Sequence, residues 1–352
     1  MNEYLSEASS AHQGAHSRCS CGVDIHAHIV PASFPAYLGS TVPQHWPSMA
    51  PAHECHRHVM INDKIYRTVS DRCWDVSRRL SDMGEMDLRL QAISPMPELL
   101  SYWMEPAPAQ QLLRYINEQI AQMVAASGQR LVAFGAVPLQ DLELAIAELR
   151  YLMQTPGFVG VELGSNINGK PIGDPAFHPF FEAAQDLGAA IFIHAVKPCG
   201  MDRLVGPAPL QQALAYPTDV GLAAASVITS GLLSKFPALK LAFSHGGGTL
   251  ASLLPRLQQA RRVFPALADA MPQAPLEVAR QLYYDALVFD PATLRHLLEL
   301  YGADQIMLGT DYPFAFREQS PVAGVMAAIK DESVRQKLLY LNAGKFLGVP
   351  VN

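Results

Sequence analysis

The 352-residue chain is 49% hydrophobic and only 16% charged, which excludes a disordered protein because it carries enough apolar surface for a large core. The net charge of −6 argues against nucleic-acid binding, which needs clustered Lys and Arg. No apolar run reaches the ~20 residues of a membrane span, and neither the polar N-terminus nor the five cysteines indicate secretion, so we expect a cytoplasmic protein with no membrane partner.

Residues 1–20, rich in Ser, Ala and His, are predicted to form a flexible N-terminal arm, and residues 21–352 to form one domain. Within this domain, short apolar runs typical of strands alternate with longer stretches that have the apolar spacing of one helix face. The predicted strands are residues 22–26, 90–94, 131–137, 158–163, 190–194, 240–244, 282–285 and 305–309. The predicted helices are residues 110–127, 141–153, 174–188, 219–236, 249–264 and 291–302.

This alternation indicates parallel strands joined by crossover helices, and eight such units predict a (β/α)₈ TIM barrel in the α/β class. A doubly wound open sheet is the alternative. That fold usually carries a glycine-rich phosphate loop after its first strand, whereas the first strand here ends in His-Ala-His.

A long insertion, about residues 29–74, follows the first predicted strand. It contains several prolines and then a polar–apolar run, in which we expect a small hairpin at residues 62–64. One helix is predicted to begin at about Asp75. Loops of this length inside a compact domain usually carry function, commonly as a cover over an active site.

The strongest local motif is His-Ala-His, at the end of the first predicted strand. His26 and His28 are two residues apart, so their side chains project to the same face of the strand. In a barrel this face opens into the mouth at the carboxyl ends of the strands, where barrel enzymes place their active sites. Two imidazoles that converge in this way are typical of a metal-binding pair.

Three further residues of metal-binding type stand where other predicted strands end. His194 ends the fifth strand, His245 follows the sixth and precedes three glycines, and Asp311 follows the eighth. The carboxyl ends of all barrel strands meet at one rim, so these residues are expected to join His26 and His28. We therefore predict a metal site there.

Together these motifs resemble the amidohydrolase superfamily, and more narrowly the amidohydrolase-2 family. The best-known members of that family are 2-amino-3-carboxymuconate-6-semialdehyde decarboxylase and related non-oxidative decarboxylases. The resemblance extends from about residue 21 to residue 349. Its other landmarks are Val-Pro-Leu-Gln-Asp at 137–141, Ser-His-Gly-Gly-Gly at 244–248 and Leu-Gly-Thr-Asp-Tyr-Pro-Phe at 308–314.

The resemblance implies a role for each rim residue. His26, His28, His194 and Asp311 match the ligands of one divalent metal ion, for which Zn²⁺ is expected and Mn²⁺ is the alternative. His245 matches a histidine that acts as general acid/base, a role for which an imidazole is suited because its pKa lies near neutrality.

The resemblance also implies substrate contacts. Two arginines match family residues that bind substrate carboxylates: Arg67 in the insertion and Arg256 after the sixth strand. In the family, the arginine matched by Arg256 reaches the site of the neighbouring subunit, so the resemblance implies a homodimer. Lys197 departs from the family pattern after the strand-five histidine, so it is either a contact for an added substrate anion or a solvated residue. Trp74 is a candidate for the pocket floor.

The expected function is metal-dependent non-oxidative decarboxylation of a small unsaturated or aromatic carboxylic acid. The alternatives are a hydrolase of the same superfamily, acting on an amide, ester or lactone, and a non-catalytic ligand-binding barrel. The fourth strand, residues 158–163, has no Lys to bridge two metals, which favours the decarboxylase, although Glu162 could in principle bridge a second ion. The role of the His-Glu-Cys-His-Arg-His run at 53–58 is left open, because its crowded spacing fits no standard zinc module.

Overall fold

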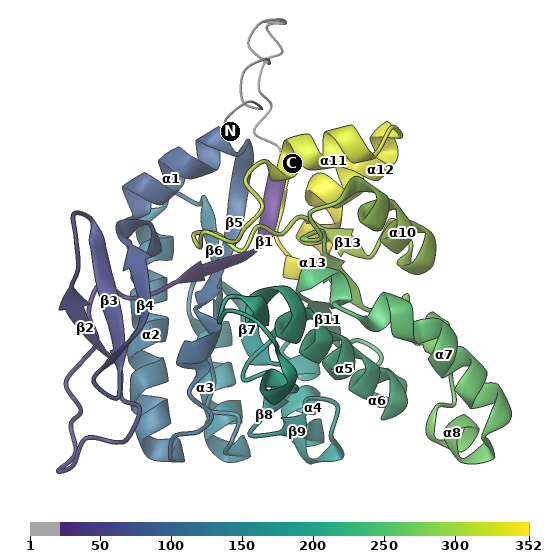
Figure 1. Cartoon of the computed structure of the whole chain (residues 1–352), viewed down its shortest axis with the longest axis horizontal. Helices are drawn as coiled ribbons and strands as arrows, with labels where there is room; N and C mark the ends of the chain where they lie inside the picture. Colours follow the sequence, from purple (N-terminus) through teal and green to yellow (C-terminus); the bar gives the residue numbers. More distant parts are fainter. Residues whose placement is uncertain (1–21, 352) are drawn as a thin grey trace, which may run out of the picture.

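The computed structural model describes residues 22–351, so the arm predicted at residues 1–20 lies outside the described residues. Its centre is an eight-stranded parallel sheet (Figure 1). Parallel bridges from Asp24 to Leu308 and from Ala27 to Tyr312 bring its two edges together, which confirms the predicted TIM barrel. In spatial order the strands are β1 (Gly22–Ile29), β5 (Leu88–Pro95), β6 (Leu131–Gly135), β7 (Phe158–Gly164), β10 (Ala190–His194), β11 (Lys240–Phe243), β12 (Tyr283–Asp285) and β13 (Ile306–Met307).

The six predicted helices are present on the outside of the barrel, although one of them is divided into two. The prediction of a single helix over 219–236 is wrong, because Gly231 adopts a left-handed φ of 68° and separates two helices there. The helices that correspond to the predictions are α2 (Pro106–Ala126), α3 (Leu142–Gln154), α4 (His178–Asp186), α5 (Tyr216–Thr229), α6 (Leu232–Lys235), α7 (Leu250–Val263) and α10 (Pro291–Tyr301).

Several short elements complete the described chain. The hairpin β8 (Asn166–Ile167) and β9 (Lys170–Pro171) follows β7. The remaining short helices, which the periodicity did not predict, are α8 (Pro265–Ala270), α9 (Pro275–Ala279), α11 (Pro321–Ala328), α12 (Glu332–Gln336) and α13 (Asn342–Leu347). Within residues 22–351, no helix combines the length and the apolar character needed to cross a bilayer.

The insertion after β1 forms an antiparallel sheet of β2 (Ser48–Pro51), β3 (His56–Ile61) and β4 (Lys64–Ser70), which lies beside the barrel at the left of Figure 1. Asn62 and Asp63 both have positive φ, as a two-residue hairpin turn requires, so the predicted hairpin is confirmed. The strand β2 was not predicted. The expected helix is α1 (Val76–Glu85), which Asp75 caps by accepting a hydrogen bond from the backbone N–H of Arg78.

Aromatic side chains fill the barrel below its mouth. The rings of Phe192 and Phe134 stack with centroids 5.9 Å apart, and Phe346 from α13 lies 6.2 Å from Phe134. Phe192 is two residues before His194 on β10 and also lies 4.9 Å from the ring of His26. The rim residues therefore stand on a packed apolar floor.

A buried polar network fastens α1 to the first strand. The fully buried guanidinium of Arg79 donates to Gln91 Oε1 and to the backbone carbonyl of His28, both at 2.7 Å, and lies over the ring of Tyr312. Gln91 in turn donates to Asp24 at 2.8 Å. Loss of the guanidinium would leave several buried acceptors without a donor.

We therefore predict that Arg79→Met lowers the free energy of unfolding by about 3 kcal/mol, measured by urea denaturation. The matched control is Arg78→Met, which removes the neighbouring arginine from an exposed ion pair with Asp71 and costs less than about 1 kcal/mol. Equal losses in the two variants would show that the network does not stabilise the barrel.

Candidate metal centre and substrate cavity

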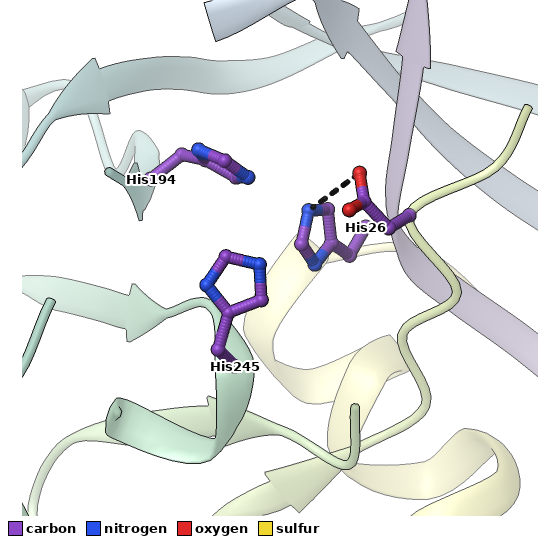
Figure 2. Close-up of side chains that lie close together, drawn as sticks. His26, His194 and His245 are labelled. Carbon is purple, nitrogen blue, oxygen red and sulfur yellow. Dashed lines mark ion pairs between the residues drawn. The ribbon is translucent and has the colours of Figure 1, made fainter. Parts of the chain in front are cut away.

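The structure brings the predicted metal-binding residues together at the carboxyl ends of the barrel strands. One donor atom from each of His26, His194, His245 and Asp311 lies within 4.8 Å of the others, as Figure 2 shows for the three histidines. His28 borders this group: its Nε2 is 3.1 Å from His26 Nε2 and 3.2 Å from Asp311 Oδ1. Residues up to 285 positions apart in the chain thus meet in one cluster.

Hydrogen bonds at Nδ1 orient three of these rings. His26 Nδ1 lies 2.6 Å from a carboxylate oxygen of Asp285, while His28 Nδ1 and His194 Nδ1 lie 3.0 Å and 2.9 Å from the backbone carbonyls of Pro95 and Ala195. Because these oxygens accept hydrogen bonds, each Nδ1 carries the proton. Each Nε2 is left with a lone pair, the form in which imidazole binds a metal.

This arrangement places electron-rich atoms against each other. The acceptor nitrogens of His26 and His28 are 3.1 Å apart, and Asp311 Oδ1 lies 3.6 Å and 3.2 Å from them. The buried Nε2 of His194 has no hydrogen-bond partner among the described residues. Three imidazoles and one carboxylate with unshared lone pairs fit a divalent cation of the Zn²⁺ or Mn²⁺ type.

Burial sets the protonation of these groups. It lowers the pKa of His28 to about 3 and that of His194 to about 4, and it lowers the pKa of His26 well below the ordinary value, with the neighbouring imidazoles adding to the effect. The imidazoles are therefore neutral at physiological pH. Burial also raises the pKa of Asp311 to about 7, although His194 and Arg67 oppose the shift.

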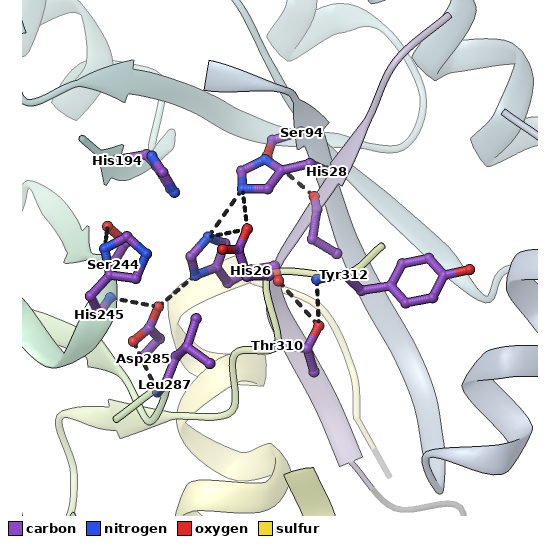
Figure 3. Close-up of polar contacts among 12 residues, drawn as sticks. His26, His28, Ser94, His194, Ser244, His245, Asp285, Leu287, Thr310 and Tyr312 are labelled. Carbon is purple, nitrogen blue, oxygen red and sulfur yellow. Dashed lines mark hydrogen bonds and ion pairs between the residues drawn. The ribbon is translucent and has the colours of Figure 1, made fainter. Parts of the chain in front are cut away.

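Asp285, which the sequence analysis did not identify, holds the site together (Figure 3). It ends β12 and is fully buried. One of its oxygens accepts from His26 Nδ1 at 2.6 Å and from the backbone N–H of His245 at 3.0 Å; the other accepts from the backbone N–H groups of Gly246 and Leu287. It therefore orients one candidate ligand and the loop that carries His245. Its position at the end of the seventh predicted strand was the signal that could have identified it.

The three glycines after His245 allow the tight turn that positions its ring. His245 itself has a φ of 55°, and all three glycines have positive φ. A Cβ at Gly248 would lie 1.9 Å from the carbonyl oxygen of Pro217, so only glycine fits there. The His245 ring lies 5.0 Å from that of His194, with its Nδ1 3.2 Å from Ser244 Oγ.

A cavity of about 290 Å³ opens above His194, His245 and Asp311. Arg67 reaches it from the inserted sheet, and its guanidinium lies 4.5 Å from the ring centroid of Phe314, another lining residue. Much of the remaining wall is apolar and includes Leu287, Val288, Phe289 and Phe316. The insertion thus contributes a charged side chain to the cavity wall, while its expected role as a cover stays a prediction.

Glu98, which the sequence analysis also missed, lines this cavity. Its carboxylate accepts a hydrogen bond from the hydroxyl of Tyr216 at 2.9 Å and lies 3.9 Å from the guanidinium of Arg67. Burial raises the pKa of Glu98, but Arg67 and the hydroxyls of Tyr66 and Tyr216 outweigh burial and hold it below the ordinary value. The charged pair thus fixes Arg67 in the wall. Nothing in the sequence around Glu98 distinguishes it from a surface residue.

The other predicted substrate residues do not line this cavity. Lys197 lines a neighbouring cavity, where its ammonium group lies 3.7 Å from the ring centroid of Trp103. Trp74 contacts the guanidinium of Arg57, and Arg256 is exposed on α7.

The run at 53–58 does not form a metal-type group. Two of its histidine rings stack, but within residues 22–351 the only such group is the rim cluster of His26, His194, His245 and Asp311.

The comparisons with known proteins agree with this geometry. The family model described as Amidohydrolase matches residues 23–349. The 2-amino-3-carboxymuconate-6-semialdehyde decarboxylase of Dictyostelium discoideum is 34% identical over 336 residues, which cover 94% of this chain and 92% of that protein.

Two solved structures share the fold. The apo form of Metarhizium anisopliae IDCase superposes with a TM-score of 0.79 and 22% identity over 93% of this chain and 97% of that chain. The second is a dihydroxybenzoic acid decarboxylase from a Polaromonas species, with bound manganese and the inhibitor 2-nitroresorcinol. It superposes with a TM-score of 0.68 and 23% sequence identity over 79% of this chain and 87% of that chain.

The contacts of Asp285 predict its role in metal binding. Asp285→Asn keeps the shape of the side chain but removes its charge and one acceptor oxygen, so metal affinity should fall about 10–100-fold. Chelator competition measures this loss. The control is Asp290→Asn, since Asp290 is an exposed helix cap and Asn caps equally well. Unchanged affinity in Asp285→Asn would remove Asp285 from the metal site.

Proposed function

The chain belongs to the amidohydrolase family, and on that premise we propose that it is a metal-dependent non-oxidative decarboxylase. Such a carbon–carbon lyase releases CO₂ from a small carboxylic acid whose unsaturated or aromatic skeleton accepts the electron pair left behind. The observation that carries the proposal is the rim cluster of His26, His194, His245 and Asp311 under a cavity that also holds Arg67. The Dictyostelium discoideum relative, a decarboxylase by name, supports the same reaction.

His26, His28, His194 and Asp311 would hold one divalent ion. We expect Zn²⁺, with Mn²⁺ as the alternative, because both accept imidazole and carboxylate ligands. When bound, the ion supplies a Lewis acid beside the cavity. We include His28 because its Nε2 contacts both His26 and Asp311. His245 also lies in the rim cluster, and we assign it to proton transfer because the family resemblance implies that role.

Arg67 would bind a carboxylate of the substrate. A guanidinium offers two parallel N–H donors that match a carboxylate, and the ring of Phe314 beneath it limits its movement. The ion pair with Glu98 holds Arg67 from the opposite wall. The apolar residues around it exclude water and suit a flat unsaturated skeleton.

His245 would supply the proton that the reaction requires. When the bond between the skeleton and the carboxylate breaks, CO₂ leaves and the electron pair remains on the carbon, which must then take up a proton. His245 lines the cavity, and the contact of its Nδ1 with Ser244 leaves the other ring nitrogen for proton transfer. Asp285 fixes the backbone of this residue and so the position of its ring.

Arg256 would complete the site of a second subunit. It is exposed on α7 among Leu222, Val263 and Phe264, and the last two are 55% and 57% exposed. Apolar side chains gathered at one surface are typical of an interface, and a two-fold axis through α7 would present the same patch from both subunits. We therefore propose a homodimer in which each Arg256 binds substrate in the partner's cavity.

The proposed reaction predicts that His245→Gln lowers the rate of CO₂ release about 10²–10⁴-fold while the metal content is retained. The measurement screens a panel of hydroxybenzoic and unsaturated acids for CO₂ release, with metal content determined by elemental analysis. The control is His296→Gln, an exposed histidine of α10, which should keep full activity.

A second variant separates proton transfer from metal binding. His194→Ala should lose both metal and activity, since it removes a buried ligand. A His245→Gln protein that kept full activity, or a His194→Ala protein with full metal content and activity, would contradict the assignment. No CO₂ release from any acid in the panel would contradict decarboxylation itself.

The shared site predicts complementation between inactive subunits. His245→Ala and Arg256→Ala proteins should each be inactive, but mixed dimers contain one site with both residues intact, so part of the activity should return after subunit exchange. Mixing His245→Ala with the double variant His245→Ala/Arg256→Ala is the control and should restore none. A fully active monomer would exclude the shared site.

A further inference from the structure

A second cavity, of about 400 Å³, lies next to the cavity above the rim cluster. Glu98 and Tyr216 line both cavities, and the hydroxyl of Tyr216 donates to the carboxylate of Glu98 at 2.9 Å. This hydrogen-bonded pair therefore lies where the two cavities meet. The second cavity is built from the loops after β5 and β10, the segment before α5 and the edge of the inserted sheet.

Lys197 brings a positive charge to this second cavity. Its ammonium group lies 3.7 Å from the ring centroid of Trp103, and it forms no ion pair within residues 22–351. Partial burial lowers the pKa of Lys197, and no nearby carboxylate opposes that shift. The residue also has a φ of 41°, a conformation that a non-glycine residue adopts at a cost. Lys197 is exposed, so it is a solvated cation that has no carboxylate partner among the described residues.

Trp103 also lines this cavity and carries a donor without a partner in residues 22–351. Its indole N–H is buried and has no hydrogen-bond partner among the described residues. A buried donor without an acceptor is costly, so a ligand oxygen that accepts from it would be bound favourably. Ile61, Pro198 and Met201 add apolar side chains to the wall of this cavity. The cavity therefore suits an anionic oxygen carried on an apolar skeleton.

The charge of Glu98 does not cancel this preference. Its carboxylate faces Arg67 at 3.9 Å and accepts from Tyr216, so its negative charge is already compensated on the side of the metal cluster. Lys197 is the charged group of the second cavity that lacks such a partner. An anion entering beside it would meet a positive field.

We propose that Lys197 and Trp103 form a subsite for a second anionic group of the substrate, remote from the carboxylate that leaves as CO₂. The substrate class is then an elongated unsaturated or aromatic diacid. One carboxylate would lie at Arg67 above the rim cluster, the skeleton would pass alongside the Glu98–Tyr216 pair that borders both cavities, and the far carboxylate would lie against Lys197. This assignment of the two ends rests on the proposed function.

The test compares binding of diacids with that of their matched monoacids. The probes are terephthalate, 4-carboxycinnamate and 1,4-phenylenediacrylate against benzoate and cinnamate, with affinities measured by calorimetry on the metal-loaded protein. At least one diacid should bind about tenfold more tightly than its monoacid, as expected for one added charge-assisted hydrogen bond. Lys197→Met should reduce that ratio to about one, and Lys197→Arg should retain it.

Two further variants complete the design. Trp103→Phe keeps the ring under the ammonium group but removes the N–H, so the ratio should fall only in part. Lys170→Met is the matched control, because Lys170 also lies over an aromatic ring, that of Phe177, but away from both cavities. It should leave the ratio unchanged.

The outcomes separate this proposal from the proposed function, since binding needs no turnover. A wild-type protein that shows no preference for any diacid, or a preference that persists in Lys197→Met, overturns the subsite whether or not CO₂ is released. A preference that depends on Lys197 in a protein that releases no CO₂ from any acid supports the subsite and overturns the decarboxylase.

Discussion

The contact between His26 and Asp285 holds the rim of the barrel in one arrangement. The two residues are 259 positions apart in the chain, on β1 and β12, and both are fully buried. His26 Nδ1 lies 2.6 Å from a carboxylate oxygen of Asp285. Burial raises the pKa of Asp285, which measures the cost of placing a carboxylate there. Three backbone N–H groups and one imidazole offset that cost. Because one of those N–H groups belongs to His245, a single carboxylate sets the positions of a candidate ligand and of the candidate acid/base.

The inserted sheet and the barrel depend on each other at the cavity. Arg67 comes from β4, yet it lies over Phe314, which follows β13, and pairs with Glu98, which follows β5. The insertion therefore supplies the cation that lines the cavity above the rim cluster. The pair of Glu98 and Tyr216 borders two cavities, of which Arg67 lines one and Lys197 the other.

The barrel and most of its rim were predictable because they depend on local pattern and on one geometric rule. Each strand shows in the sequence as a short apolar run, and parallel strands of a barrel end at the same rim. The grouping of His26, His28, His194, His245 and Asp311 therefore follows from the sequence alone. The division of one helix at Gly231 was not predictable, since the apolar spacing continues across it and only the backbone conformation breaks it.

The sequence by itself determined the barrel, the rim cluster and the family, since periodicity and residue type at strand ends are local properties of the chain. The tertiary structure decided what surrounds the cluster. Only packing brings Asp285 against His26, pairs Glu98 with Arg67, and places Lys197 at Trp103 instead of at the rim cluster. The physical reason is that a hydrogen bond or ion pair depends on distances of a few ångströms between residues remote in sequence, and these distances are set by how loops pack over the barrel.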